Sequence, residues 1–410
     1  MTPPYETKLK AMTFFGLTKP LVAAFLMALF SIEAFAEIGT TEVEIPIQIP
    51  SSTKGTLEFN VHVRIHTPPE GLRNADLPPV ILTHGIINSD GIVQKLARHL
   101  TRRGFVVWTY NQPGFGQQGR VTQTVHEPTR GEYGLTSLSG VVGSLIETVT
   151  RQSGRKPIFI GYSLGGVALE MHLHGLTGIR QDGRLILSPH SAVHRQKSLA
   201  KAVFISTPTL ATDDMPRGLR LLYESAKCAN CVFGHRDGFL DLGFGRERSL
   251  TGLALGLSST LTPELVMRGL FQDVTVWENL DPESRKLAEY LKSNFSNIHT
   301  DLIRDLAAAA KHIDEAKLSP LRHVATVQVV GSRDKIADPK KIESTHRDRL
   351  RHSPQHELLI ADGVGHLDIL ENKVLDSGLA ESLISRLQKQ TGLPNKLGRC
   401  EASFRFLGTR

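Results

Sequence analysis

The stretch of sequence that decides the fold runs Pro157-Ile-Phe-Ile-Gly-Tyr-Ser-Leu-Gly-Gly166. Its apolar residues, Ile158 to Ile160, are typical of a short strand buried on both faces of a parallel sheet. The chain then breaks into Gly-x-Ser-x-Gly, centred on Ser163, and continues as an apolar helical pattern. A strand, a sharp turn and a helix in this order predict a nucleophile elbow with Ser163 at its tip.

The residues around Ser163 suit that turn. A serine at its tip has an exposed Oγ and a strained backbone, so its neighbours must be small, and Gly161 and Gly165 meet this need. Because a helix begins here, the N–H of Leu164 lies near the positive end of the helix dipole, where it can stabilise an oxyanion. We expect Ser163 to be a nucleophile and Leu164 to supply half of an oxyanion hole; the alternative is a serine in an ordinary tight turn.

Outward from this motif, continuous apolar runs alternate with helical stretches. The strand-like runs are residues 80–83, 105–109, 202–206 and 325–330, and the helical stretches include residues 92–103 and 137–152. Residues 43–49 and 57–65 instead alternate apolar and polar side chains, which is the pattern of a half-exposed antiparallel hairpin. The sequence therefore predicts an α/β fold with a mostly parallel central sheet flanked by helices and edged by a hairpin.

The predicted sheet has one long interruption. Residues 209–320 carry no strong strand run, and the part from 283 to 314 is rich in helix formers. We expect this segment to form an inserted, mainly helical cap or lid. The core then comprises residues 37–208 and 321–410, and the second part ends in a C-terminal tail.

Residues 1–36 have the pattern of a secretory signal peptide. Three lysines precede the apolar run 21–32, and Ala34-Phe-Ala36 offers a small-x-small cleavage site. The apolar run is too short to span a bilayer, so a transmembrane anchor is disfavoured. The pattern predicts export, either to a periplasm or to the outside of the cell, and removal of the segment lowers the net charge from +7 to +6.

Composition limits the other classes of function. Hydrophobic residues make up 40% and charged residues 22% of the 410 residues, which is ordinary for a globular protein. Nucleic-acid binding is disfavoured because aromatic residues make up only 6% of the chain and no block of Lys and Arg is interleaved with them. Transient contact with an anionic membrane or lipid surface stays open. In an exported chain, Cys228 and Cys231 are expected to form a local disulfide, which leaves Cys400 unpaired.

A serine nucleophile needs a base and an orienting carboxylate. Asp334 lies a few residues after the predicted strand 325–330, with Asp338 as its competitor. His366 follows a later apolar run in a glycine-rich loop, so the chain presents serine, acid and base in the order expected for a strand-ordered hydrolase. We expect Asp334 to be the acid and His366 the base; the alternatives are a turn or capping aspartate and a surface histidine.

The second oxyanion donor is expected in the loop Thr83-His-Gly-Ile86, where Gly85 lets the chain turn so that the N–H of Ile86 faces the site. A catalytic metal or other cofactor is not expected. His172 and His174 point to different faces of a helix, and no His-Glu-x-x-His run exists. Asp237 and Asp241 flank a glycine-rich stretch and could hold calcium, although solvated loop charges are the plainer interpretation.

Together, His84-Gly85, Asn111-Gln-Pro-Gly-Phe-Gly116, the turn at Ser163, Gly331-Ser-Arg-Asp334 and Gly365-His366 resemble the α/β-hydrolase superfamily of serine esterases and lipases. The resemblance covers residues 57–208 and 321–390. It implies that Ser163 is the nucleophile, Asp334 the acid, His366 the base, and the amides of Ile86 and Leu164 the oxyanion hole.

This chain departs from the commoner family pattern where Asn111-Gln-Pro replaces the usual Asp and Arg, a change expected to affect local packing more than chemistry. A serine in the elbow argues against the dehalogenase and epoxide-hydrolase relatives, which use aspartate there. The expected substrate is a small-molecule or lipid ester with an apolar acyl group. The same triad could instead cleave an amide, thioester or peptide, and the remaining alternative is a binding protein without turnover.

Overall fold

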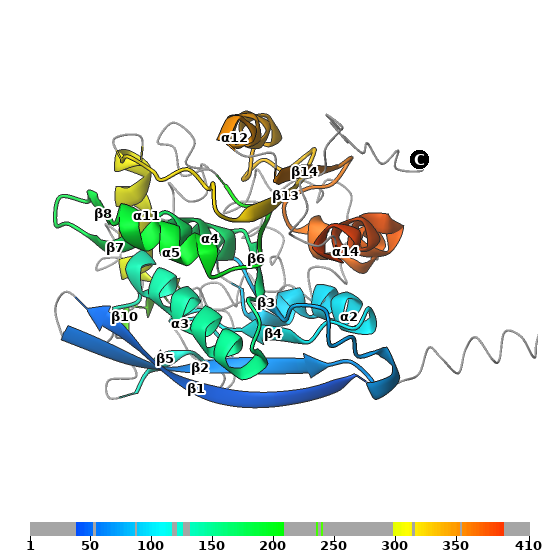
Figure 1. Ribbon diagram of the computed structural model, residues 1–410. Helices are drawn as coiled ribbons and strands as arrows, with labels where there is room; N and C mark the ends of the chain where they lie inside the picture. The colour runs from blue at the N-terminus through cyan, green and yellow to red at the C-terminus, as the bar shows by residue number, and fades with distance from the viewer. Residues whose placement is uncertain are drawn as a thin grey trace, which may run out of the picture.

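A nine-stranded sheet runs through the centre of the protein in the computed structural model (Figure 1). The structure describes residues 38–51, 55–86, 88–116, 121–125, 132–208, 235–236, 239–240, 298–313, 316–352 and 355–388. From one edge to the other the strands are β1 (Gly39–Ser51), β2 (Gly55–Thr67), β4 (Val107–Tyr110), β3 (Val80–Thr83), β6 (Ile158–Tyr162), β9 (Lys201–Ile205), β13 (Ala325–Gly331) and β14 (His356–Ala361). The short strand β5 (Gln123–Thr124) pairs with β2.

The sheet is mostly parallel, as the sequence predicted. Strands β3, β4, β6, β9, β13 and β14 are parallel to their neighbours in this group. Strands β1 and β2 form the expected antiparallel edge hairpin, and β2 is also antiparallel to β4. Every residue of β3, β6, β9 and β13 is buried, which explains why these strands appear in the sequence as continuous apolar runs.

The strand order reverses at the centre of the sheet. From β3 the chain crosses to β4 on one side, and it later returns to β6 on the other side of β3. In open parallel sheets, ligands bind outside the carboxyl ends of the strands at such a switch point. The loops that follow β3 and β6 therefore lie side by side at the place where a site is expected.

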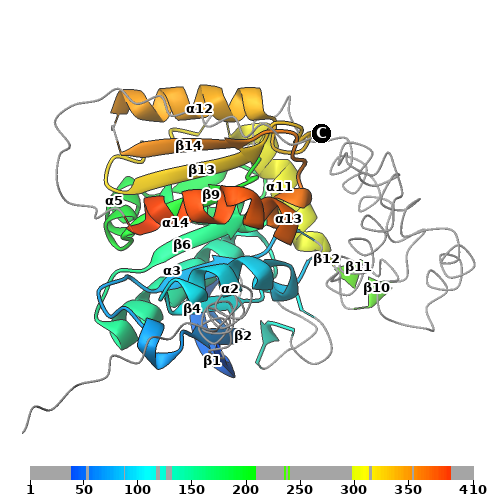
Figure 2. The same ribbon diagram turned by 90° about the vertical axis from the view of Figure 1, so that its right-hand side faces the viewer.

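Helices cover both faces of the sheet. One face carries α2 (Gln94–Arg102) and α14 (Ala380–Gln388), which lie together in front of the strands in Figure 2. The other face carries α3 (Leu135–Ser153), α4 (Leu164–Leu173), α5 (Pro189–Lys197) and α12 (Pro339–His352). Short turns of helix complete the described chain: η1 (Glu70–Leu72), η2 (Asp90–Val93), η4 (Asp368–Leu370), α13 (Asn372–Val374) and η5 (Leu375–Leu379).

Helix α4 is the most deeply buried of these helices. Nine of its ten residues are buried, so it is apolar all round rather than on one stripe. A partly buried ion pair between Glu170 of α4 and Arg349 ties it to α12, and the Arg349 guanidinium also lies 5.1 Å from the ring centre of Phe204. The helix that follows Ser163 is therefore held on the sheet by packing and by charge.

The segment 209–320 is described only in part, and the predicted cap remains a prediction. Its described residues include a small antiparallel sheet of β10 (His235–Arg236), β11 (Phe239–Leu240) and β12 (Ile298–His299), and helix α11 (Thr300–His312). Apolar side chains of α11, among them Leu302 and Leu306, belong to the main hydrophobic core. The last part of the segment thus packs against the main hydrophobic core.

Two further features complete the fold. Strands β7 (Leu176–Ile179) and β8 (Leu185–Leu187) pair with each other outside the main sheet. In the part of the chain that the structure describes, no helix has the length and apolar character required to span a bilayer. The predicted signal peptide, residues 1–36, and the cysteines Cys228, Cys231 and Cys400 lie outside the described residues.

Candidate active site

Ser163 occupies a strained turn between β6 and α4. It has φ +50° and ψ −116°, and is one of only two described non-glycine residues with positive φ. A methyl carbon at Gly161 would lie 2.5 Å from the backbone of Gly165, and one at Gly165 would lie 2.5 Å from Thr83. Both positions therefore exclude a side chain, and the motif Gly-x-Ser-x-Gly follows from the close approach of β6, α4 and β3.

His366 lies directly beside this serine. Its Nε2 atom is 3.0 Å from Ser163 Oγ, and only 4% of the histidine and 5% of the serine are exposed. Its Nδ1 atom faces the Asp334 carboxylate, with N–O distances of 3.0 and 2.9 Å. Because a carboxylate only accepts hydrogen bonds, Nδ1 carries the proton and Nε2 is free to accept the serine hydroxyl. The arrangement gives a serine, a base and an orienting acid in hydrogen-bond contact.

The loop after β13 fixes Asp334 in place. Its Oδ1 atom accepts hydrogen bonds from the backbone N–H groups of Ile336 at 2.9 Å and Ala337 at 2.8 Å. These bonds orient the carboxylate toward His366, and Asp334 is only 3% exposed. The competing Asp338 instead accepts a hydrogen bond from the backbone N–H of Lys340, at the start of α12. Of the two candidate acids, the structure brings Asp334 to the histidine.

The two predicted oxyanion donors belong to segments that approach Ser163. Leu164 is the first residue of α4, and Ile86 follows Gly85, where an added methyl carbon would lie 2.9 Å from Ser163 Cβ. Within the described part of the chain, the N–H groups of Ile86 and Leu164 donate to no protein acceptor. Two unpaired amides close to a serine hydroxyl are the donor set that an oxyanion requires.

His84 orients the loop that carries Ile86. Its Nε2 atom accepts the backbone N–H of Gln112 at 3.1 Å, so its Nδ1–H donates to the carbonyl of Gly85 at 2.8 Å. Burial lowers the pKa of His84 to about 4, which keeps the ring neutral near pH 7 and preserves this tautomer. In the Gly85–Ile86 peptide the C=O and N–H point in opposite directions, so holding the carbonyl also directs the Ile86 amide.

Gln112 completes this brace, and sequence reasoning missed its role. Its side-chain Nε2 donates to the carbonyl of His84 at 2.6 Å, and the residue is only 1% exposed. Its neighbour Asn111 accepts the backbone N–H of Asp90 at 2.7 Å. The departure from the family pattern at Asn111-Gln-Pro therefore reaches the loop that carries Ile86. The only sign of this role in the sequence was the pair of amide side chains, Asn111 and Gln112, after an apolar strand.

The other polar residues considered in the sequence are two histidines and two aspartates. In the described ranges, no group of three or more His, Cys, Asp or Glu side chains is arranged to hold a metal ion. Buried His172 contacts the carbonyl of Ser139 and His174 contacts that of Ser319, so each has a structural partner. Asp237 and Asp241, considered for calcium, lie outside the described residues.

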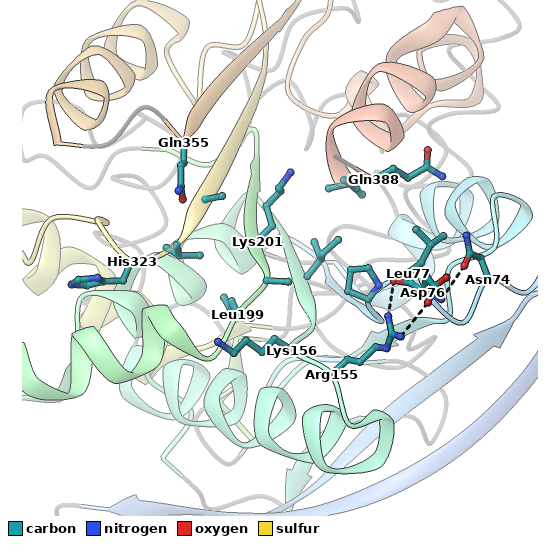
Figure 3. Close-up of a pocket in the computed structure, with 16 residues that line it drawn as sticks. Asn74, Asp76, Leu77, Arg155, Lys156, Leu199, Lys201, His323, Gln355 and Gln388 are labelled. Carbon is teal, nitrogen blue, oxygen red and sulfur yellow. Dashed lines mark hydrogen bonds and ion pairs between the residues drawn. The ribbon is translucent and has the colours of Figure 1, made fainter. Parts of the chain in front are cut away.

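An open hollow lies at the other end of the sheet (Figure 3). Its lining includes Lys201 and Ala325, which begin β9 and β13, whereas Ser163 follows the carboxyl end of β6. Two of its cations have partners: Arg155 pairs with Asp76, and Lys201 donates to the carbonyl of Arg386. This hollow is therefore separate from the serine site.

Comparison with known proteins identifies the family of the chain. A family model described as "Alpha/beta hydrolase family" matches residues 80–375. The chain belongs to the alpha/beta hydrolase family. The match spans the elbow, the acid loop and the base loop, and it confirms the superfamily to which the sequence motifs pointed. No curated protein sequence matches the chain.

Solved structures of this α/β-hydrolase fold resemble the chain at low sequence identity. A thermostable carboxyl esterase from Bacillus coagulans, solved with glycerol, is 14% identical, with 85% of this chain and 98% of that chain covered and a TM-score of 0.53. An esterase from Thermogutta terrifontis is 16% identical, with 84% and 99% covered and a TM-score of 0.49. The epoxide hydrolase VrEH1 from Vigna radiata is 15% identical, with 84% and 98% covered and a TM-score of 0.48. The likeness to the Bacillus coagulans structure shows the fold alone.

Proposed function

We propose that this α/β-hydrolase is an exported serine hydrolase that cleaves carboxylic esters through an acyl-enzyme. The observation that carries the proposal is the contact of His366 Nε2 with Ser163 Oγ at 3.0 Å, while the same ring is paired with Asp334. A serine hydroxyl becomes a useful nucleophile only when such a base takes its proton. A serine nucleophile with such a base favours acyl transfer.

The reaction would proceed in two halves. His366 Nε2 removes the proton of Ser163 as Oγ attacks the ester carbonyl carbon, and the N–H groups of Ile86 and Leu164 stabilise the oxyanion. The proton then passes from His366 to the leaving alkoxide as the ester C–O bond breaks. In the second half His366 deprotonates a water molecule that attacks the acyl carbon, and Ser163 recovers its proton as the acid leaves. Asp334 stabilises the imidazolium in both halves.

An apolar acyl ester is the proposed substrate class. Partly buried apolar side chains, including Ile86 and Val364, pack on the core next to the serine and base loops. The similarity to the Bacillus coagulans carboxyl esterase supports ester chemistry. The predicted cap, residues 209–320, is the part of the chain proposed to set the acyl-length preference, because inserted lids commonly decide what enters such a site.

Hydrolysis of p-nitrophenyl esters of rising acyl length tests the proposal, with Ser163→Ala measured alongside. We expect turnover by the protein without residues 1–36 and a loss of at least about 1000-fold in the variant. Matched anilide and thioester substrates identify the leaving group. Ester hydrolysis that survives Ser163→Ala, or its absence on every ester, would contradict the proposal.

Export is tested separately from chemistry. The full chain is expressed in a bacterium, the cells are fractionated, and the N-terminus of the product is sequenced. We expect a product that begins at Glu37 outside the cytoplasm, since Ala34-Phe-Ala36 is the predicted cleavage site. A cytoplasmic product that retains residues 1–36 would refute export without affecting the proposed reaction.

A further inference from the structure

Tyr162, the residue before the proposed nucleophile, reaches the loop of the proposed base. It is the variable residue between Gly161 and Ser163 in the elbow motif, and its side chain is completely buried. Its phenol O–H donates a hydrogen bond to the backbone carbonyl of His366 at 3.0 Å. One residue of the elbow therefore holds the main chain of the base, 204 positions later in the sequence.

The ring of Tyr162 contacts two catalytic loops. Its centre lies 5.5 Å from the His366 ring centre, with an angle of 38° between the planes. On the oxyanion loop, a methyl carbon at Gly85 would lie 3.1 Å from Tyr162 Cε1. The tyrosine thus lies against the oxyanion loop as well as the base loop, and it is itself part of the elbow.

Other bonds secure the residues that precede His366. The N–H of Gly365 donates to Asp368 at 3.0 Å, and the carbonyl of Val364 accepts the N–H of Arg333 at 2.9 Å. These bonds tie the base loop to itself and to the acid loop. The bond from Tyr162 adds a tie from the base to the strand that carries the nucleophile.

The phenol keeps its proton over the working range of pH. Burial raises the pKa of Tyr162 well above its ordinary value, and the nearby carboxylates of Asp334 and Asp368 raise it further. A tyrosine that stays neutral always has an O–H to donate, so this tie does not switch off as the pH changes.

We propose that Tyr162 is a positioning residue that sets the distance and angle between His366 and Ser163. The inference rests on the proposed serine chemistry and extends it to a residue that touches no substrate. Without the O–H the His366 carbonyl is free to shift, and a displacement of about 1 Å at reacting groups can cost about 100-fold in rate. The expected effect falls on the chemical steps and not on substrate binding.

The test compares Tyr162→Phe with Tyr133→Phe. Tyr133 is also completely buried, its hydroxyl accepts the N–H of Thr124 at 3.3 Å, and its ring packs against Phe59 and His299 rather than against the described residues of the proposed triad. Both variants lose one buried phenol O–H, and their melting temperatures are measured to show that both are folded. We expect Tyr162→Phe to lower kcat on p-nitrophenyl butyrate by about 10- to 100-fold with KM within about twofold, and Tyr133→Phe to keep kcat.

A spectroscopic readout separates this inference from the proposed function. The Nδ1 proton shared by His366 and Asp334 is expected to give a low-field proton NMR signal that is absent from His366→Ala. Tyr162→Phe should shift or broaden this signal, and Tyr133→Phe should leave it unchanged. A shift in Tyr162→Phe supports positioning even if the wild-type protein hydrolyses no ester, an outcome that would count against the proposed function alone. An unchanged signal with unchanged kcat in Tyr162→Phe, or an equal loss of kcat in Tyr133→Phe, would overturn the inference.

Discussion

The Nδ1 atom of His366 lies 3.0 and 2.9 Å from the two carboxylate oxygens of Asp334. The loop that carries Asp334 also supplies two backbone N–H groups that donate hydrogen bonds to this carboxylate. The acid is therefore fixed before any substrate arrives, and it can select one tautomer of the histidine. This relationship links the β13 loop to the β14 loop, which are neighbours because their strands are adjacent and parallel.

The first prediction distinguishes the two candidate acids. Asp334→Asn should lower kcat by about 10⁴-fold, because an amide in this position favours the histidine tautomer that cannot accept the serine proton. Asp338→Asn should leave kcat unchanged, since Asp338 contacts the N–H of Lys340 and asparagine can accept the same bond. Steady-state hydrolysis of one p-nitrophenyl ester by both variants gives the comparison. A large loss of kcat in Asp338→Asn would show that the assignment of Asp334 as the acid is wrong.

The second prediction concerns the brace behind the oxyanion loop. Gln112→Leu keeps most of the side-chain volume but removes the donor to the His84 carbonyl, which should loosen the Ile86 amide and lower kcat by about 10- to 100-fold. Gln196→Leu is the matched control, because Gln196 is equally buried and donates to the carbonyl of Leu173, away from the triad. Both kcat and KM are measured for the two variants, and equal values of kcat would show that Gln112 does not support the Ile86 amide.

Much of this architecture could be predicted from local patterns. The strands β3, β6, β9 and β13 are buried on both faces, so each leaves a continuous apolar run in the sequence. The elbow was equally visible, because the contacts of Gly161 and Gly165 exclude every larger residue. The order of serine, acid and base follows from the order of the strands and needs no knowledge of distances.

The features that escaped prediction depend on contacts between distant residues. Gln112 reaches His84 across 28 positions, and neither residue carries a local pattern that marks the contact. Helix α11 lies in the segment predicted to form a cap, and its Leu302 and Leu306 are part of the main hydrophobic core. An amphipathic helix has the same periodicity whichever surface it covers, so the sequence did not show which side chains α11 contacts.

The third prediction tests the steric basis of the elbow. Gly161→Ala would place a carbon 2.5 Å from backbone atoms of Gly165 and Gly166, which no side-chain rotation can relieve. We expect a loss of about 3 kcal/mol in the free energy of unfolding, measured by urea denaturation. Gly71→Ala serves as the control, because that position has open space around it and should change stability little. Equal stability of the two variants would show that the elbow can relax.

The fourth prediction uses the carboxylate that joins α11 to the core. Asp305 accepts the N–H of Leu135 at 3.0 Å, at the start of α3. Burial, the largest influence, raises its pKa from 3.8 to about 6, and Arg304 and the Leu135 N–H only partly offset that increase. A carboxyl whose pKa is raised on folding binds its proton more tightly in the folded state. Its contribution to stability is therefore full below about pH 4 and is lost as the pH rises through about 6.

Asp305→Asn removes this pH dependence and keeps an oxygen that can accept the Leu135 N–H. The variant should gain stability relative to the wild-type protein as the pH rises from about 4 to about 7, by about 1 to 3 kcal/mol in total. Urea unfolding of both proteins at several pH values measures the difference, with Asp182→Asn as a control at an exposed carboxylate. The wild-type protein could instead become more stable relative to the variant as the pH rises. That result would show that the attraction of Arg304 and the α3 N-terminus for the carboxylate outweighs the cost of burying it.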